Sequence, residues 1–277
     1  MDKLQAKLNQ LKWLKHAGIG YYCSEQKDSK NSLMKKLKIV PKANFQDKMP
    51  KIITEQIKPQ PIKVKEESGL TANIAEARRL AESAKNLDEL KTIVENFNGC
   101  ALKNFATNTV FCDGQPNAEI LLIGEAPGAT EDKQGIPFCG ESGKLLDKML
   151  KTIGLDRVRN IYITNTIFWR PPANRRPTPE EIKICSPFVE KHIQLLAPKL
   201  IILIGGTAAT ALLGKKESIT YIRENYYPYT NQYLKEPILT AALFHPAFLL
   251  RSPYKKKDTW FDLLKIRDYI QKKGIVI

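Results

Sequence analysis

Apolar and polar positions divide the chain into three regions. Residues 1–23 carry leucines at helical spacing with lysines between them, which predicts a short amphipathic helix. Residues 24–70 are rich in lysine and proline and poor in aromatic residues, so they bury too little apolar surface to offset the entropy of ordering. We therefore expect a flexible linker there and a folded domain over residues 71–277.

The folded region begins with two helices and continues as alternating strands and helices. Residues 72–97 predict a helix pair, whose second member starts after Asn86, carries Glu89 three places on and is closed by Gly99. We expect strands at 118–123, 161–164, 199–204 and 238–244, and helices at 142–153, 178–196, 207–213 and 258–272. Near-continuous apolar strands separated by helices predict an α/β fold, with a parallel sheet covered on both faces.

The charge of the chain favours a polyanionic partner. The 277 residues are 43% hydrophobic, which is enough for an apolar core. Their formal net charge is +15, so we expect an excess of cations on the surface. Nucleic acid is the first candidate partner. The alternative is that the lysines only keep the protein soluble.

Membrane and disulfide-dependent classes are excluded by other features. No apolar run is long enough to span a membrane, and the N-terminus lacks the apolar core of a signal peptide. Five widely spread cysteines argue for a reducing compartment without a disulfide framework. We expect a cytoplasmic, nucleoid-associated monomer with no membrane partner.

Two loops that follow apolar strands carry the main candidates for chemistry. Glu125 comes directly after the first predicted strand, and His245 comes after the last. Ligands of open α/β sheets bind at the carboxyl ends of strands, so both side chains can face one cleft. The alternatives are a carboxylate that caps a loop and a structural histidine. His192 lies within a predicted helix, where a structural role is expected.

Three further features fit recognition of a nucleotide. The carboxamide of Asn165, at another strand end, matches the donor and acceptor edge of uracil. Phe138 stands on a constrained loop from which it could stack on a base, and the arginine-rich loop 169–176 suits phosphate. A turn asparagine, a core phenylalanine and a solvated loop are the respective alternatives.

Other motifs fail. Residues 140–145 resemble a phosphate-binding P-loop, but Phe138 replaces its first glycine and Leu145 replaces the residue that would bind magnesium. The sequence contains no Cys-x-x-Cys pair and no zinc deaminase signature. We therefore expect no zinc site.

Five blocks in order resemble the uracil-DNA glycosylase superfamily, most closely its family 4. The blocks are 124–132, 135–146, 162–165, 170–181 and 245–251, and the similarity covers about residue 98 to the C-terminus. The resemblance implies a three-layer α/β/α sandwich around a parallel four-stranded sheet. It also implies a DNA repair enzyme that everts uracil from single- or double-stranded DNA, hydrolyses its N-glycosidic bond and leaves an abasic site.

The resemblance assigns roles to individual residues. Glu125 would position the attacking water and balance the sugar's positive charge, and His245 would steady the negative charge on the departing base. The base itself would be bound by the backbone at Ala126, by Glu131 at its C5 edge, by stacking on Phe138 and by Asn165, with Asn174 as a secondary candidate. The expected DNA contacts are Arg170, Arg175, Phe248, Leu249 and Arg251.

The cysteines that bind an iron–sulfur cluster in family 4 are only partly present in this sequence. Family 4 usually binds a [4Fe–4S] cluster through four cysteines, of which Cys100 and Cys185 hold family-like positions here. Lys103 and Trp169 stand where the other two are expected. Two thiolates cannot complete a four-thiolate site. We expect no metal and no other cofactor, with Trp169 in the vacated volume. Recruitment of Cys112 or Cys139 stays open at this point.

Two alternatives to uracil excision stay open at this point. One is a non-catalytic DNA-binding or polymerase-associated module that keeps the fold, although the joint presence of Glu125, Asn165 and His245 argues against it. The other is a glycosylase with broader specificity, including hypoxanthine or xanthine. No lysine is evidently placed for a Schiff base, so we expect no strand cleavage.

Overall fold

The centre of the molecule is one mixed sheet. The computed structural model describes residues 68–277, which form a six-stranded sheet in the order β1-β3-β2-β4-β6-β5. The strands are β1 (Asp113–Gly114), β2 (Ile120–Gly124), β3 (Tyr162–Asn165), β4 (Leu200–Ile204), β5 (Tyr227–Tyr229) and β6 (Ile238–Leu243). The four central strands are parallel, as predicted, and β1 and β5 are antiparallel edges.

The edge strands were not predicted because they are short and lack an apolar run. β1 has two residues, and β5 contains Pro228, which has no N–H to donate to a ladder. Pairing with β3 and β6, rather than local pattern, makes these segments extended.

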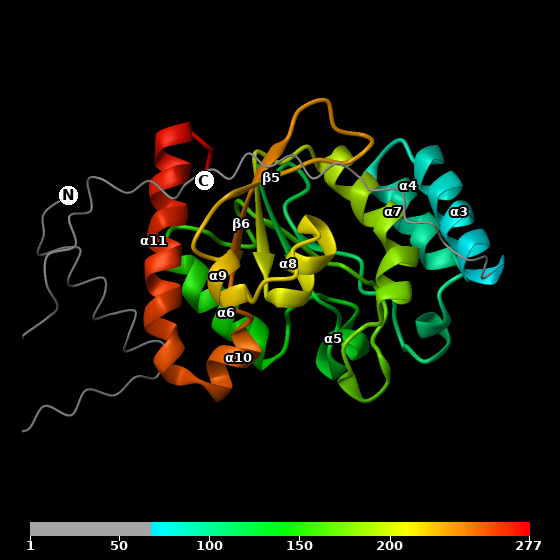
Figure 1. Cartoon of the computed structure of the whole chain (residues 1–277), viewed down its shortest axis with the longest axis horizontal. Coiled ribbons are helices and arrows are strands. Elements are labelled where there is room, and N and C mark those ends of the chain that lie inside the picture. The colour runs from blue at the N-terminus through cyan, green and yellow to red at the C-terminus, as the bar shows by residue number, and fades with distance from the viewer. Residues whose placement is uncertain (1–67) are drawn as a thin grey trace, which may run out of the picture.

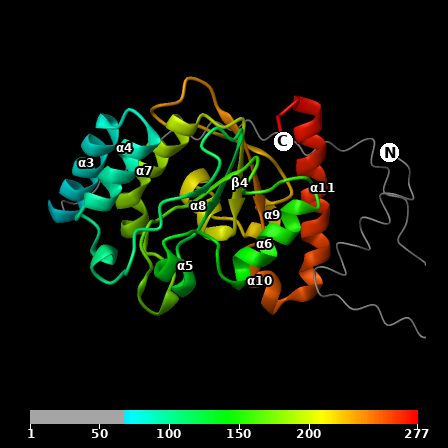
Figure 2. The same cartoon turned by 180° about the vertical axis from the view of Figure 1, so that it is seen from behind.

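Helices cover both faces of the sheet, which gives the expected three layers (Figures 1 and 2). Alternate residues of a strand point to opposite faces, and β2 shows this directly. Ile120 and Leu122 belong to one apolar core with α6 (Glu141–Lys151) and α11 (Lys256–Lys273). Leu121 and Ile123 belong to another with α7 (Pro179–Leu196) and α8 (Gly206–Leu213).

The remaining helices are mostly short. They are α3 (Ser68–Ser83), α4 (Leu87–Asn96), α5 (Ala129–Gln134), α9 (Ile219–Ile222) and α10 (Pro246–Arg251), with 3-10 turns at Ala101–Asn104, Pro172–Asn174 and Pro253–Lys255. α3 and α4 pack on α7 and form the outer layer on that side (Figure 1). None of the helices between residues 68 and 277 combines the length and apolar character needed to cross a membrane.

Helix ends follow the capping signals, with one exception. The side chain of Asn86 accepts a hydrogen bond from the Glu89 amide, as predicted, and Thr178 forms a capping box with Glu181 at the start of α7. The prediction for Gly99 is wrong, because α4 already ends at Asn96 and the next residue is extended.

The N-terminal boundary also differs from the expectation. α3 begins at Ser68, so the last three residues assigned to the linker 24–70 are helical. The helix expected at 1–23 and the rest of the linker lie outside the described residues.

His192 is structural, as predicted. It lies in α7 with no exposed surface, its ring stacks on Phe111 at a centroid distance of 4.5 Å, and its Nε2 lies 2.8 Å from the hydroxyl of Tyr162. Burial lowers the pKa of His192 from 6.5 to about 3, so the ring is neutral near pH 7.

This buried histidine should make the fold sensitive to acid. The folded protein binds the proton of His192 more weakly than the unfolded chain does, so its stabilising effect is complete above pH 6.5 and is lost as the pH falls toward 3. We expect the free energy of unfolding, measured by urea titration, to fall by roughly 2–3 kcal/mol between pH 6.5 and 4.5 through this group.

A His192→Gln variant provides the control, because glutamine can still hydrogen bond Tyr162 but does not titrate. Between pH 6.5 and 4.5, the free energy of unfolding of this variant should fall by roughly 2–3 kcal/mol less than that of wild type. Burial raises the pKa of Asp262 to about 6, which acts with the opposite sign, but this carboxyl is present in both proteins. Equal pH slopes for the two proteins would contradict the assignment.

Candidate active site

The carboxyl ends of the parallel strands meet at one edge of the sheet and carry the predicted polar residues. Gly124 pairs with Asn165 in the register of β2 and β3, which places Glu125 beside that asparagine. His245 follows β6, which is separated from β2 only by β4. Neighbouring strands lie about 4.8 Å apart, so the two loops are roughly 10 Å apart. The structure therefore brings the acid and the imidazole together.

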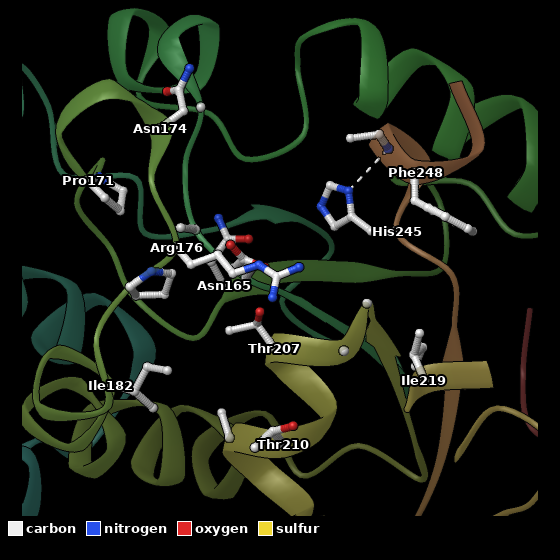
Figure 3. A pocket seen from close by; sticks show the side chains of 18 of the residues that line it. Asn165, Pro171, Asn174, Arg176, Ile182, Thr207, Thr210, Ile219, His245 and Phe248 are labelled. Atoms are coloured by element: carbon white, nitrogen blue, oxygen red, sulfur yellow. Dashed lines mark hydrogen bonds between the residues drawn. The ribbon is translucent and has the colours of Figure 1, made fainter. Parts of the chain in front are cut away.

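A cleft of about 1190 Å³ opens between these loops (Figure 3). It is lined by Glu125, Phe138, Asn165 and His245. Its volume exceeds the ~300–1,000 Å³ of usual small-molecule sites, so it has room for more than one everted base. The additional room extends between the arginine-rich loop and the start of α8.

Asn165 offers an unsatisfied acceptor inside this cleft. The residue is 1% exposed, and its Oδ1 has no hydrogen-bond partner among residues 68–277. Buried polar atoms are normally paired, so this oxygen is available to a donor that enters the cleft. Gly124 leaves the necessary space, because a Cβ there would lie 2.5 Å from this Oδ1.

Phe138 packs its ring over the end of β2. It is 6% exposed and has a positive φ of 53°, a conformation rarely adopted by bulky residues. A Cβ on Gly124 would lie 2.4 Å from its Cζ, so glycine allows the ring to lie against the strand end. The ring centroid is 5.8 Å from that of His245. A planar ligand can therefore lie near both rings.

Arg157 holds the Phe138 loop and was missed by sequence reasoning. Its guanidinium donates to the carbonyls of Pro137 and Phe138 at 3.1 and 2.9 Å, and it forms ion pairs with Asp113 and Asp147. Nothing in its local sequence signals this role, because its partners lie 10 to 44 residues away.

His245 is held as a neutral hydrogen-bond donor. It caps the N-terminus of α10, and its Nδ1 accepts a hydrogen bond of 3.1 Å from the Ala247 amide (Figure 3). The proton of the neutral ring is therefore on Nε2. Burial lowers the pKa of His245, and the nearby negative charge of Glu125 opposes this only in part. Near pH 7 the ring can donate one hydrogen bond without carrying charge.

The Glu125 loop is fixed by its backbone. The hydroxyl of Thr166 donates to the carbonyl of Glu125 at 2.6 Å, and the Thr166 amide donates to that of Gly124 at 2.9 Å. Glu125 and Ala126 are half-buried and line the cleft. A carboxylate in this position can orient a water molecule or balance a positive charge on a ligand.

The next two acids are partly used by the fold. Glu131 lines the cleft, but its Oε1 accepts a hydrogen bond of 2.8 Å from the Gly140 amide. Asp132 is buried and accepts from the amides of Thr107 and Asn108. Asp132 is therefore structural, and a contact between Glu131 and a base stays a prediction.

The arginine-rich loop contributes to the cleft unevenly. Nε of Arg170 donates to Oδ1 of Asn174 at 2.7 Å, and Arg175 forms a two-bond ion pair with Glu181. Asn174, Arg175 and Arg176 line the cleft, whereas Arg170 does not. If Arg170 and Arg175 contact DNA as predicted, their guanidinium groups would bond to the DNA as well as to Asn174 and Glu181.

The side chain of Leu249, an expected DNA contact, faces the apolar core, and the contact stays a prediction. The segment after His245 is a helix, in which successive side chains point about 100° apart, and Leu249 has no exposed surface. Phe248 and Arg251 line the cleft, and their expected contacts with DNA stay predictions. Leu250, which sequence reasoning passed over, is 45% exposed and lies outside the core.

Comparison with known proteins agrees with this architecture. The model of the uracil DNA glycosylase superfamily matches residues 111–265. A type-4 uracil-DNA glycosylase of Sulfurisphaera tokodaii is 39% identical over 188 residues, which cover 66% of this chain and 84% of the relative. A type-4 uracil-DNA glycosylase of Archaeoglobus fulgidus is 36% identical over 191 residues, which cover 68% of this chain and 96% of the relative. A DNA polymerase of Bacillus phage SP01 is 28% identical over 165 residues, which cover 60% of this chain and 17% of the polymerase.

The fold and cleft define an α/β protein with a polar ligand site at the carboxyl edge of its sheet. The matched span exceeds half of the 277 residues. The chain belongs to the uracil-DNA glycosylase superfamily.

The residues around the family-like cysteines do not fit a four-thiolate cluster. Cys100 and Cys185 are buried beside each other, and their mutual hydrogen bond together with burial raises the pKa of the Cys185 thiol. Lys103 donates to the carbonyl of Glu95 and to Asn98. Within residues 68–277, no three His, Cys, Asp or Glu side chains form a metal-binding group, with Cys112 and Cys139 included in that search.

Trp169 occupies the apolar side of this region. It is 1% exposed, belongs to the same core as both cysteines, and donates from Nε1 to the hydroxyl of Thr109 at 3.0 Å. A buried indole with a satisfied N–H packs as a structural side chain.

Purified protein should therefore lack an iron–sulfur cluster. We expect no broad visible absorbance, less than about 0.1 iron per chain by metal analysis, and unchanged folding after anaerobic reconstitution with iron and sulfide, because two thiols cannot complete the ligand set. Stoichiometric iron and sulfide that bind to wild type but not to a Cys100→Ser variant would contradict this.

Proposed function

We propose that this protein is a uracil-DNA glycosylase, which hydrolyses the N-glycosidic bond of uracil in DNA and leaves an abasic site. The observation that carries the proposal is the buried, unpartnered Oδ1 of Asn165 in the cleft that also contains Glu125 and His245. The similarity to type-4 enzymes supports the same substrate.

Recognition requires an extruded base. Eversion from a duplex costs a few kcal/mol, less at a mismatch, and stacking on an aromatic ring returns about 1–3 kcal/mol. Phe138 supplies that ring. The Oδ1 of Asn165 would accept from the N3–H of uracil, and its amide would donate to a neighbouring carbonyl. Cytosine presents an unprotonated N3 there, so it would leave the buried acceptor unpaired.

Bond cleavage would use the two strand-end residues. As the C1′–N1 bond breaks, its electron pair moves onto the base, and Nε2–H of His245 would stabilise the negative charge at the base carbonyl. Glu125 would balance the positive charge on the sugar and orient a water whose oxygen bonds to C1′. One proton of that water would be released, and the base would leave as an anion that later takes a proton. A neutral histidine can fill this role because its Nε2–H donates a hydrogen bond to the developing anion.

A second candidate has specific support. Because a DNA polymerase shares this region, the domain could be a polymerase-associated module that binds DNA without catalysis. An assay on paired oligonucleotides that contain uracil, hypoxanthine, xanthine or thymine separates the candidates. Excision of uracil supports the proposal, excision of the purines as well broadens it, and DNA binding without excision favours the module.

Replacement of Asn165 should abolish uracil selection while DNA binding remains. We expect Asn165→Ala to lower kcat/KM on uracil DNA by at least about 100-fold, because a two-bond contact and a buried acceptor are lost together. The salt dependence of DNA binding should not change, since the amide touches no phosphate in the proposed complex.

Asn96→Ala is the matched control, because this asparagine is exposed on α4 and bonds only to Thr92 of the same helix. It should retain wild-type excision. Wild-type kcat/KM in Asn165→Ala would remove the residue from recognition.

Replacement of His245 should slow cleavage rather than binding. We expect His245→Ala to lower the single-turnover rate by about 10²–10³-fold, the usual effect of removing one donor at a developing charge. His245→Asn should be equally slow but more stable than the alanine variant, since asparagine can still cap α10 by accepting from Ala247. A wild-type rate in either variant would rule out the proposed role.

A further inference from the structure

Of the three arginines in the loop that follows β3, one has a side chain without a partner among residues 68–277. Arg170 is bonded to Asn174, and Arg175 is paired with Glu181 at 2.6 and 2.9 Å. The exposed side chain of Arg176 has no ion pair or side-chain hydrogen bond among the described residues. It also lines the cleft.

The pairing of Arg175 explains where Arg176 points. The backbone at Arg175 is extended, with φ −63° and ψ 163°, so the side chains of Arg175 and Arg176 point in different directions. Glu181 holds Arg175 against the start of α7 while it also accepts from the Thr178 amide. Arg176 is therefore directed away from α7. Figure 3 shows it reaching across the cleft near Asn165 and Thr207.

The loop holds this arrangement rigidly. Ala173 and Asn174 both have positive φ, 54° and 53°, which non-glycine residues rarely adopt. The bond from Arg170 to Asn174 and the prolines on either side, Pro171, Pro172 and Pro177, restrict the alternatives. Such strain persists where surrounding structure enforces it, and it is concentrated at functional sites.

We propose that Arg176 binds a backbone phosphate next to the everted nucleotide. This proposal rests on DNA as the substrate. The side chain of Arg176 extends over the cleft that contains the proposed base site, and the additional volume of the cleft offers room for the strand itself. Lys183 and Arg251 line the same cleft with Arg175 and Arg176, and these four cations outnumber the three lining carboxylates, Glu125, Glu131 and Glu217. An arginine without a carboxylate partner can give both donors of its fork to one phosphate.

Variants of the full-length chain test the assignment by the salt dependence of binding. Fluorescence anisotropy over 50–300 mM salt would use a duplex in which a 2′-fluorinated deoxyuridine resists cleavage. We expect Arg176→Ala to weaken binding about tenfold and to reduce the slope of log K against log salt by about 1, the effect of one lost phosphate contact. Arg176→Lys should retain the slope, because its charge is kept.

Two comparison variants make the result specific. Arg79→Ala removes an equally charged residue that is paired with Glu76 on α3, so its slope should match wild type. Arg175→Ala should lower the melting temperature and change the slope less than Arg176→Ala does, because Arg175 is already paired. An unchanged slope in Arg176→Ala, or a larger change in Arg175→Ala, would overturn the assignment.

Excision kinetics separate this proposal from the proposed function. With uracil DNA, Arg176→Ala should raise KM about tenfold and leave the single-turnover rate within about threefold of wild type. A lower rate with an unchanged KM would place Arg176 in the chemistry with Glu125 and overturn the phosphate assignment. Absence of excision by wild type would refute the glycosylase proposal, while the slopes of the uncleavable complex would still decide the role of Arg176.

Discussion

The parallel register of β2 with β3 is the constraint on which the site depends. It pairs Gly124 at the end of β2 with Asn165 at the end of β3, so a residue without a side chain lies beside the carboxamide. The missing Cβ leaves space for the ring of Phe138 and for the oxygen of Asn165 at the same point. Parallel pairing of β4 and β6 then places His245 at the same edge. A sheet of mixed direction at its centre would scatter these residues over two edges.

The site carries two polar groups that a ligand can use. The Oδ1 of Asn165 is buried without a partner, and burial holds the pKa of His245 below its usual range. Each of these groups would be satisfied by a ligand with a donor for the first and an acceptor for the second. Uracil has both, since its N3–H and its carbonyl oxygens lie on one ring. The proposed substrate therefore supplies a donor to the buried oxygen of Asn165, which has no partner among the described residues.

Support for this site comes from outside the strands. Arg157 binds the carbonyls that shape the Phe138 loop, and Glu181 binds the arginine next to Arg176 while it also caps α7. In the region where family 4 usually binds a cluster, the buried pair of cysteines and Trp169 form part of an apolar core. Hydrogen bonds and side-chain packing thus position the loops of the cleft.

Sequence alone was enough for the α/β class, the four parallel strands, the capping of α4 and α7 and the gathering of Glu125, Asn165 and His245. These features follow from local apolar periodicity, from local hydrogen bonds and from the common direction of parallel strands, which need no knowledge of distant contacts. Only the tertiary structure decided that Leu249 is buried, that β1 and β5 exist and that Arg157 holds the Phe138 loop. It also showed that the side chain of Arg175 is paired with Glu181, whereas that of Arg176 has no partner among the described residues. In each of these cases the partner lies several to dozens of residues away, and which side a residue faces is determined when that partner packs against it.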